Sequence, residues 1–393
     1  MEQTWRWFGP NDKVALPEIR QAGAEGIVTA LHEIPYGVAW SLEAIRERQA
    51  LLADMPWSVV ESLPVSEKIK LGEPGLDEIF ENYRMSIRNL AACGVRTICY
   101  NFMTVIDWTR TELGHVLPSG AKALRFNAAQ SAAFDCYILE RPGAEDDYAP
   151  ALLDKARAWM KGASEADRAT LLASIMAGLP GAYDRYDVPA LKKLVARYRE
   201  IGRADLVAHH ARFLREVVPA AEECGVRLAI HPDDPPFDIF GLPRIVSRAE
   251  DLQTILDHVP SPANGLTFCT GALGAGAHND VPALARRFAP HIHFVHLRNV
   301  AKEPDGSFME SDHLGGDVDM VAVVRTLLAE QARRMDEGHE RWRIPFRPDH
   351  GHEIADDLRR GAFPGYPLIG RLRGLAEIRG VMKAVAQLEG LPA

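Results

Sequence analysis

The sequence predicts an α/β protein with the (β/α)8 TIM barrel fold and a helical insertion after the fourth strand. Eight short apolar runs alternate with helical patterns along the 393 residues. Several runs stop abruptly at polar residues, as buried parallel strands do where they enter loops. No Gly-x-Gly-x-x-Gly pattern follows the first run, which gives little reason to expect an open dinucleotide-binding sheet.

The order of the predicted elements follows from apolar periodicity and from helix-terminating residues. The expected strands cover residues 4–8, 26–31, 57–63, 96–102, 227–231, 265–270, 292–298 and 344–347. The expected helices cover residues 16–23, 41–55, 76–93, 205–224, 247–258, 281–288, 317–338 and 375–388. Ser41 is a suitable N-cap for its helix, and Gly225 follows its helix as a stop signal.

The segment 112–202 interrupts this alternation. It contains no convincing strand but several helical patterns, separated by Pro142, Pro150, Pro180 and Pro189. Connections of this length in a compact domain are usually functional lids or insertions. We therefore expect one TIM-barrel domain over residues 1–393, with a helical insertion or lid at about 112–202.

Composition narrows the class of protein. The chain is 47% hydrophobic and has 45 basic against 54 acidic residues, a net charge of −9, without a Lys/Arg-rich block. We expect no nucleic-acid partner and, because no long apolar run is present, no membrane span. The first residues lack the apolar core of a signal peptide, and the five scattered cysteines fit a reducing compartment. The predicted location is cytoplasmic.

Each of the last four predicted strands ends in a possible metal ligand. These residues are His231, Cys269, His296 and Asp349. In a barrel, strand ends lie side by side on one rim, so residues far apart in sequence converge. Two imidazoles, a thiol and a carboxylate form a plausible ligand set for a divalent transition metal. His293 lies three residues before His296 and should point to the opposite face of its strand.

Each ligand also has a simpler structural interpretation. Cys269 can be a small buried hydrophobe, His296 a core histidine and His231 a turn residue. Four such residues at four equivalent positions nevertheless favour the metal site. Sulfur and imidazole favour zinc or iron by affinity, the carboxylate also suits manganese, and a closed tetrahedral zinc would be structural. The cofactor we expect is Mn2+ or Fe2+, with zinc less likely. The residues alone do not choose the metal.

Residues near these ligands are candidates for proton transfer and substrate binding. His350 follows Asp349, and Tyr366 lies on a Gly- and Pro-rich loop after the eighth strand, so we predict both as catalytic. The predicted substrate-binding residues, which can receive a carboxylate or lie on a neighbouring loop, are Arg298, Asn299, His313, Arg347 and Arg371.

Long motifs in the chain resemble the D-mannonate dehydratase family. They are Phe-Arg-Pro-Asp-His-Gly-His from Phe346, Gly-Tyr-Pro-Leu-Ile-Gly-Arg-Leu-Arg-Gly-Leu-Ala-Glu-Ile-Arg-Gly from Gly365, Phe-Val-His-Leu-Arg-Asn from Phe294, Asn-Phe-Met-Thr-Val-Ile-Asp-Trp-Thr-Arg-Thr from Asn101, and the opening Thr-Trp-Arg-Trp-Phe-Gly.

The resemblance implies a xylose-isomerase-like barrel, metal ligation by His231, Cys269, His296 and Asp349, and acid/base roles for His350 and Tyr366. The implied activity is that of a hydro-lyase of hexuronate catabolism, which converts D-mannonate to 2-keto-3-deoxy-D-gluconate and water. We also expect a homo-oligomer.

Two alternatives remain at this stage. A metal-dependent aldose–ketose isomerase would need a second metal site and a carboxylate-rich ligand set, which Cys269 disfavours. A non-catalytic sugar-acid binding barrel would hold a closed structural zinc and would leave His350 and Tyr366 without a task.

Overall fold

The computed structural model describes residues 1–177 and 187–392. Within these residues, eight parallel strands close a barrel in the order β1-β12-β9-β8-β7-β4-β3-β2. The barrel strands are β1 (Glu2–Arg6), β2 (Gly26–Thr29), β3 (Trp57–Glu61), β4 (Thr97–Tyr100), β7 (Arg227–Ile230), β8 (Asn264–Cys269), β9 (Ile292–His296) and β12 (Pro345–Arg347). The predicted fold is confirmed, and the predicted strands shift by only a few residues.

Helices follow the strands and cover the outside of the barrel. The eight that match the sequence pattern are α1 (Leu16–Gln21), α2 (Leu42–Leu51), α4 (Asp77–Ala92), α9 (Arg203–Glu223), α10 (Ala249–His258), α12 (Val281–Phe288), α13 (Met320–Asp336) and α15 (Leu368–Glu389). The Ser41 hydroxyl accepts a hydrogen bond from the backbone amide of Ala44, so the predicted N-cap of α2 is confirmed. Short helices α3 (Glu67–Lys70), α11 (Thr270–Gly274) and α14 (Asp357–Arg360) lie on loops.

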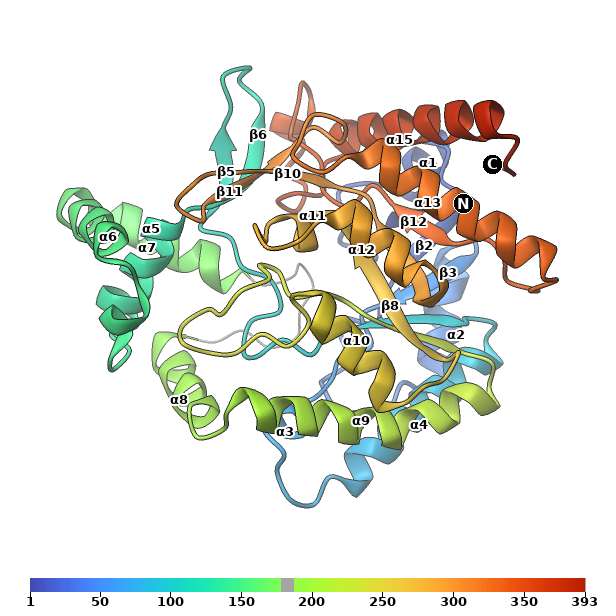
Figure 1. The fold of residues 1–393 in the computed structure, drawn as a ribbon, viewed down its shortest axis with the longest axis horizontal. Helices are drawn as coiled ribbons and strands as arrows, with labels where there is room; N and C mark the ends of the chain where they lie inside the picture. Colours follow the sequence, from blue (N-terminus) through green and yellow to red (C-terminus); the bar gives the residue numbers. More distant parts are fainter. Residues whose placement is uncertain (178–186, 393) are drawn as a thin grey trace.

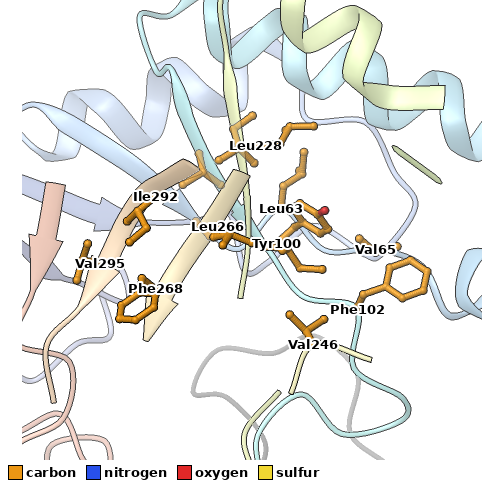
Figure 2. Packing of buried hydrophobic residues seen from close by; sticks show 14 of the residues in the cluster. Leu63, Val65, Tyr100, Phe102, Leu228, Val246, Leu266, Phe268, Ile292 and Val295 are labelled. Carbon is orange, nitrogen blue, oxygen red and sulfur yellow. The ribbon is translucent and has the colours of Figure 1, made fainter. Parts of the chain in front are cut away.

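The barrel is packed on both sides of its wall. Leu228, Leu266 and Ile292, on three neighbouring strands, belong to the large cluster between strands and helices (Figure 2). Burial of each such side chain contributes about 1.5–3 kcal/mol. A smaller cluster of inward-facing residues contains Val28, Val59, Cys99, Ala229 and Phe294. It fills the barrel interior below the carboxyl ends of the strands.

A second sheet corrects the prediction for the start of the insertion. Residues 112–126, expected to contain no strand, form the hairpin β5 (Glu112–Val116) and β6 (Lys122–Phe126). The hairpin joins β10 (Asn299–Lys302) and β11 (Phe308–Ser311) in the order β10-β11-β6-β5, here called the accessory sheet. The position of the hairpin in a sheet also depends on a partner that is distant in sequence, since Arg125 of β6 pairs with Met309 of β11.

The described remainder of the insertion is mainly helical, as predicted. It contains α5 (Ala128–Ala133), α6 (Pro150–Gly162), α7 (Glu165–Met176) and α8 (Val188–Tyr198), with the short turns Phe134–Ile138 and Ala144–Asp147. Residues 178–186, which include Pro180, lie outside the described residues. Figure 1 shows α5, α6 and α7 to one side of the barrel, beside the accessory sheet. In the described part of the chain, no helix combines the length and apolar character needed to span a membrane.

Candidate active site

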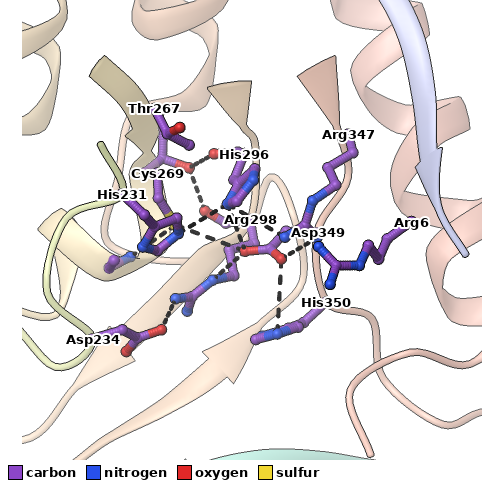
Figure 3. Close-up of polar contacts among 12 residues, drawn as sticks. Arg6, His231, Asp234, Thr267, Cys269, His296, Arg298, Arg347, Asp349 and His350 are labelled. Atoms are coloured by element: carbon purple, nitrogen blue, oxygen red, sulfur yellow. Dashed lines mark hydrogen bonds and ion pairs between the residues drawn. The ribbon is translucent and has the colours of Figure 1, made fainter. Parts of the chain in front are cut away.

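Three predicted metal ligands converge at the carboxyl end of the barrel. One potential ligand atom each from His231, Cys269 and His296 lies within 4.8 Å of the others. His231 Nε2 and His296 Nδ1 are 3.1 Å apart. Asp349 completes the group, because its Oδ2 is 3.7 Å from Cys269 Sγ and 3.8 Å from His296 Nδ1 (Figure 3). These four residues are called the metal cluster below.

Strand register explains why these residues meet. Cys269 pairs with His296 across β8 and β9, and His296 pairs with Arg347 across β9 and β12. His231 comes directly after β7, and Asp349 two residues after β12. His296 also lies two residues beyond Phe294 of the interior cluster, so both point into the barrel. His293 lies against Gly265, which pairs with Ala229 of the interior cluster. The pairing of β8 with β9 shifts by one residue at this point, so the prediction that His293 points to the opposite face of its strand is not confirmed.

The chemistry of the donor set fits a divalent metal. His231 Nδ1 is 2.6 Å from the carbonyl oxygen of Pro232. A carbonyl only accepts, so Nδ1 carries a proton and the lone pair of the neutral ring is on Nε2, which faces His296. Burial lowers the pKa of His231, which favours the neutral ring that a metal ligand requires.

The second imidazole has a carboxylate behind it. His296 Nε2 is 3.5 Å from Glu61 Oε2, while its Nδ1 faces the metal cluster. A carboxylate on the far side of a ligating histidine orients the ring and raises its basicity. The residues therefore fit a divalent metal, and soft sulfur together with imidazole points to a transition metal.

Buried arginines surround the cluster with ion pairs. Arg298 Nε donates to Asp349 Oδ2 at 2.6 Å, and Arg347 Nη2 donates to Glu61 Oε1 at 2.7 Å. Arg347 also donates to Asp349 Oδ1, as the close-up in Figure 3 shows. Burial opposes ionisation of Asp349, but Arg347 and the neighbouring cations outweigh it and hold the pKa of this carboxyl well below its usual range.

The two predicted catalytic residues are in contact with each other. His350 Nε2 is 3.3 Å from the Tyr366 hydroxyl, and both side chains are at least 96% buried. Burial raises the pKa of Tyr366 to about 12, so the phenol keeps its proton at neutral pH. Both residues line a pocket that also contains Arg298, Arg347 and Asp349. The structure thus brings the predicted proton-transfer pair to the metal cluster.

The predicted substrate-binding residues divide into two groups. Arg298 and Arg347 line the pocket, although their guanidinium groups already bind carboxylates. The Asn299 amide donates to the carbonyls of His313 and Val318 and so holds a loop.

The remaining two residues also contact backbone. The Arg371 guanidinium donates to the carbonyls of Arg6, Tyr366 and Pro367, and His313 Nε2 is 2.7 Å from the carbonyl oxygen of Pro348. These contacts anchor the loops around the pocket. Direct contact of Asn299, His313 and Arg371 with substrate stays a prediction.

Several residues of the site were missed by sequence reasoning. Asp234 stands in the same His-Pro-Asp-Asp run as His231 and pairs with Arg110 and Arg298. Its position after β7 was a usable signal, as was the position of Glu61 at the end of β3. Glu310 had no such signal, because it lies on β11 of the accessory sheet. Trp108 also lines the pocket, although its motif in the sequence did not indicate a role in the site.

The barrel fold and the residues of this site together indicate a class of enzyme. A (β/α)8 barrel that gathers two imidazoles, a thiol and a carboxylate beside a buried histidine–tyrosine contact is typical of metal-dependent barrel enzymes. The fold is that of a xylose isomerase domain protein from Alicyclobacillus acidocaldarius subsp. acidocaldarius, which is 14% identical with a TM-score of 0.50 and coverage of 98% of this chain and 99% of that one.

Sequence comparison gives the family. The profile of D-mannonate dehydratase (UxuA) matches residues 1–390. The chain is 55% identical over 391 residues to a mannonate dehydratase from Chromohalobacter salexigens, covering 99% of this chain and 100% of that protein. It is 35% identical to the crystal structure of mannonate dehydratase from Streptococcus suis serotype 2, with a TM-score of 0.77 and coverage of 99% and 95%. The chain belongs to the D-mannonate dehydratase family.

Proposed function

We propose that the protein removes water from D-mannonate to give 2-keto-3-deoxy-D-gluconate, as a hydro-lyase of hexuronate catabolism. The observation that carries this proposal is the contact between His350 and Tyr366 beside the metal cluster, in a chain of the D-mannonate dehydratase family. The rival isomerase needs a second metal site. Within residues 1–177 and 187–392, one His/Cys/Asp/Glu group with ligand geometry is found, and it contains a thiol.

His231, Cys269, His296 and Asp349 would hold the metal, with Mn2+ or Fe2+ as our proposed ion. A bound divalent ion supplies a Lewis acid that favours negative charge on substrate oxygens. The arginines paired with Asp349 and Glu61 keep these carboxylates ionised and fixed. The site is therefore organised before substrate arrives, which lowers the cost of reaching the transition state.

Proton transfer is assigned to the two buried side chains. His350 Nε2 takes the proton from C2, and the electron pair of that C–H bond forms the C2–C3 double bond. The C3 hydroxyl leaves as water with the proton of the Tyr366 phenol. The enol then loses its O2 proton and gains one at C3, giving the keto acid. Tyr366 suits the donor role because its phenol carries a proton at neutral pH, and burial raises its pKa further, to about 12.

Substitution of each residue tests these roles. His350→Asn and Tyr366→Phe should each lower kcat by about 10²–10⁴-fold, because each removes a positioned proton-transfer group. Metal content should remain at the wild-type level, since neither residue belongs to the metal cluster. Normal turnover in both variants would show that the assignment is wrong. Product is followed as keto-deoxy acid, which an isomerase does not form from any sugar.

Location and assembly are separate proposals. All five cysteines are free in the described part of the chain, which supports the cytoplasm as the working location. We also propose a homo-oligomer. Light scattering coupled to size-exclusion chromatography would test this by giving the molar mass of the assembly.

A further inference from the structure

We propose that Glu310 is a positioning residue that fixes the orientation and tautomer of His350, and that the accessory sheet holds Glu310 in place. This inference rests on the proposed function, since it assigns Glu310 a task in the same reaction. Glu310 lies on β11, outside the barrel, and only 3% of its surface is exposed.

The first observation is a line of three side chains. Glu310 Oε1 is 3.1 Å from His350 Nδ1, and His350 Nε2 is 3.3 Å from the Tyr366 hydroxyl. Burial opposes ionisation of Glu310, but Arg298, His350 and Arg110 outweigh it and hold the pKa of the carboxyl far below its usual range. An ionised carboxylate only accepts, so His350 Nδ1 carries the proton. In the neutral ring the lone pair is then on Nε2, facing Tyr366 and the pocket.

The second observation is a double attachment of the loop 350–352. The side chain of Glu310 accepts from His350, and the backbone carbonyl of Glu310 accepts from His352 Nε2 at 2.9 Å. One residue of β11 therefore holds both histidines of the His-Gly-His run. The next residue along, Glu353, exchanges two backbone hydrogen bonds with Lys122 of β6, at 2.8 and 3.0 Å. Two neighbouring strands of the accessory sheet thus contact this loop.

The third observation is that Glu310 itself is held rigidly. Arg298 Nη1 and Arg110 Nη2 both donate to Glu310 Oε1, at 2.7 and 2.8 Å. Phe308, on the same side of β11, stacks on Phe126 of β6 with ring centroids 5.4 Å apart. Loss of a third group that orients a catalytic base in this way strongly lowers kcat, because a ring in the wrong tautomer cannot accept the proton.

Asp234 allows this role to be separated from a purely structural one. It binds the same two arginines as Glu310, Arg110 and Arg298. Its loss disturbs the same ion-pair network while the contact between Glu310 and His350 remains. Asp234→Leu is therefore the matched control for Glu310→Leu.

The kinetic test is a double-mutant cycle in the metal-loaded, full-length protein. Glu310→Leu should lower kcat by about 100-fold with KM and metal content within twofold of wild type. In the His350→Asn background the same substitution should cost less than about twofold, because the ring it orients is gone. Glu310→Gln keeps an acceptor at Oε1 and places its amide where Oε2 makes no hydrogen bond, so it should retain activity within about tenfold.

The cycle separates failure of the inference from failure of the proposed function. We expect Asp234→Leu to lower kcat by the same factor in the wild-type and His350→Asn backgrounds. If wild type is active and Glu310→Leu also lowers kcat by the same factor in both backgrounds, then Glu310 acts through the arginines and the inference is wrong. If wild type makes no keto-deoxy acid from D-mannonate, the proposed function fails.

Side-chain 15N NMR of histidine tests the inference independently of activity and of whether any Glu310 variant folds. The protein is loaded with diamagnetic zinc, and His350 is assigned by the signals missing from His350→Asn. We expect the Nδ1–H tautomer for His350 in wild type and loss of this preference in folded Glu310→Leu. An Nε2–H tautomer in wild type would overturn the proposal.

Discussion

The barrel rim and the accessory sheet supply side chains to the same pocket by different routes. The rim places His231, Cys269 and His296 together through strand register alone, since each stands at or directly after the end of a neighbouring strand. The accessory sheet delivers Glu310 through pairing between β11 and β6, whose partners are far apart in sequence. The proposed metal ligands thus come from the barrel itself, whereas the carboxylate that contacts His350 comes from an addition to the barrel.

Loss of a rim ligand should have the largest effect. Cys269→Ala removes the sulfur of the metal cluster from a fully buried position, so we expect loss of bound metal and a fall in turnover of more than about 10³-fold. Metal content by mass spectrometry and keto-deoxy acid formation measure this.

The matched control for Cys269 is Cys99→Ala. Cys99 is equally buried but belongs to the interior cluster below the site. The Cys99→Ala variant should therefore keep its bound metal. If both variants retain metal, or both lose it, the rim has no special ligand at Cys269.

Weakening the accessory sheet should have an intermediate effect. Phe126→Ala removes a 97% buried ring that stacks on Phe308, at a cost of about 3 kcal/mol. Because the sheet lies outside the barrel, backbone hydrogen exchange should increase in residues 122–126 and 308–311 but not in the barrel strands. Val116→Ala, at a position 62% exposed on the same hairpin, should change stability by less than about 0.5 kcal/mol.

Equal exchange changes in barrel and accessory sheet would show that the two regions unfold together. The two regions would then differ in the side chains that they supply to the pocket but not in stability.

The smallest effect is a pH dependence of stability away from the pocket. His210 on α9 is 99% buried, with Nε2 3.1 Å from the Tyr100 hydroxyl. Burial lowers its pKa from 6.5 to about 3 in the folded protein. Between about pH 3 and pH 6.5 the unfolded chain binds a proton at His210 that the folded protein does not. The contribution of neutral His210 to the free energy of unfolding is therefore present above pH 6.5 and is lost as pH falls.

Relative to a His210→Leu variant, wild type should therefore lose about 2 kcal/mol of its free energy of unfolding between pH 7 and pH 5. Urea unfolding of both proteins at the two pH values measures it. A difference that stays constant from pH 7 to pH 5 would contradict a buried neutral His210.

Most of the barrel was predictable because its signals are local. The run Gly-Ile-Val-Thr-Ala-Leu at residues 26–31 reads as a buried strand without knowledge of its partners. Likewise, a polar residue directly after such a run is placed at the rim by the fold, which is why the metal cluster and His350 were identified correctly as neighbours.

The remainder was hidden because it depends on tertiary pairing. The segment Phe308–Ser311 has four residues and its side chains alternate between buried and half-buried, a pattern too short to distinguish from a loop. Glu112–Val116 contains an interior glycine, which weakens the strand signal. Sequence also gave no means to foresee that Arg298 and Arg347 would bind carboxylates of the protein, since ion-pair partners come from distant segments.

We propose that the metal cluster holds an ion without which the protein does not dehydrate D-mannonate. The most direct measurement uses metal-depleted protein with D-mannonate, with and without added manganese or ferrous iron, and follows keto-deoxy acid. We expect no product from the depleted protein and recovery of activity with either metal. Full activity without metal, or no product from folded protein with any divalent metal, would contradict it.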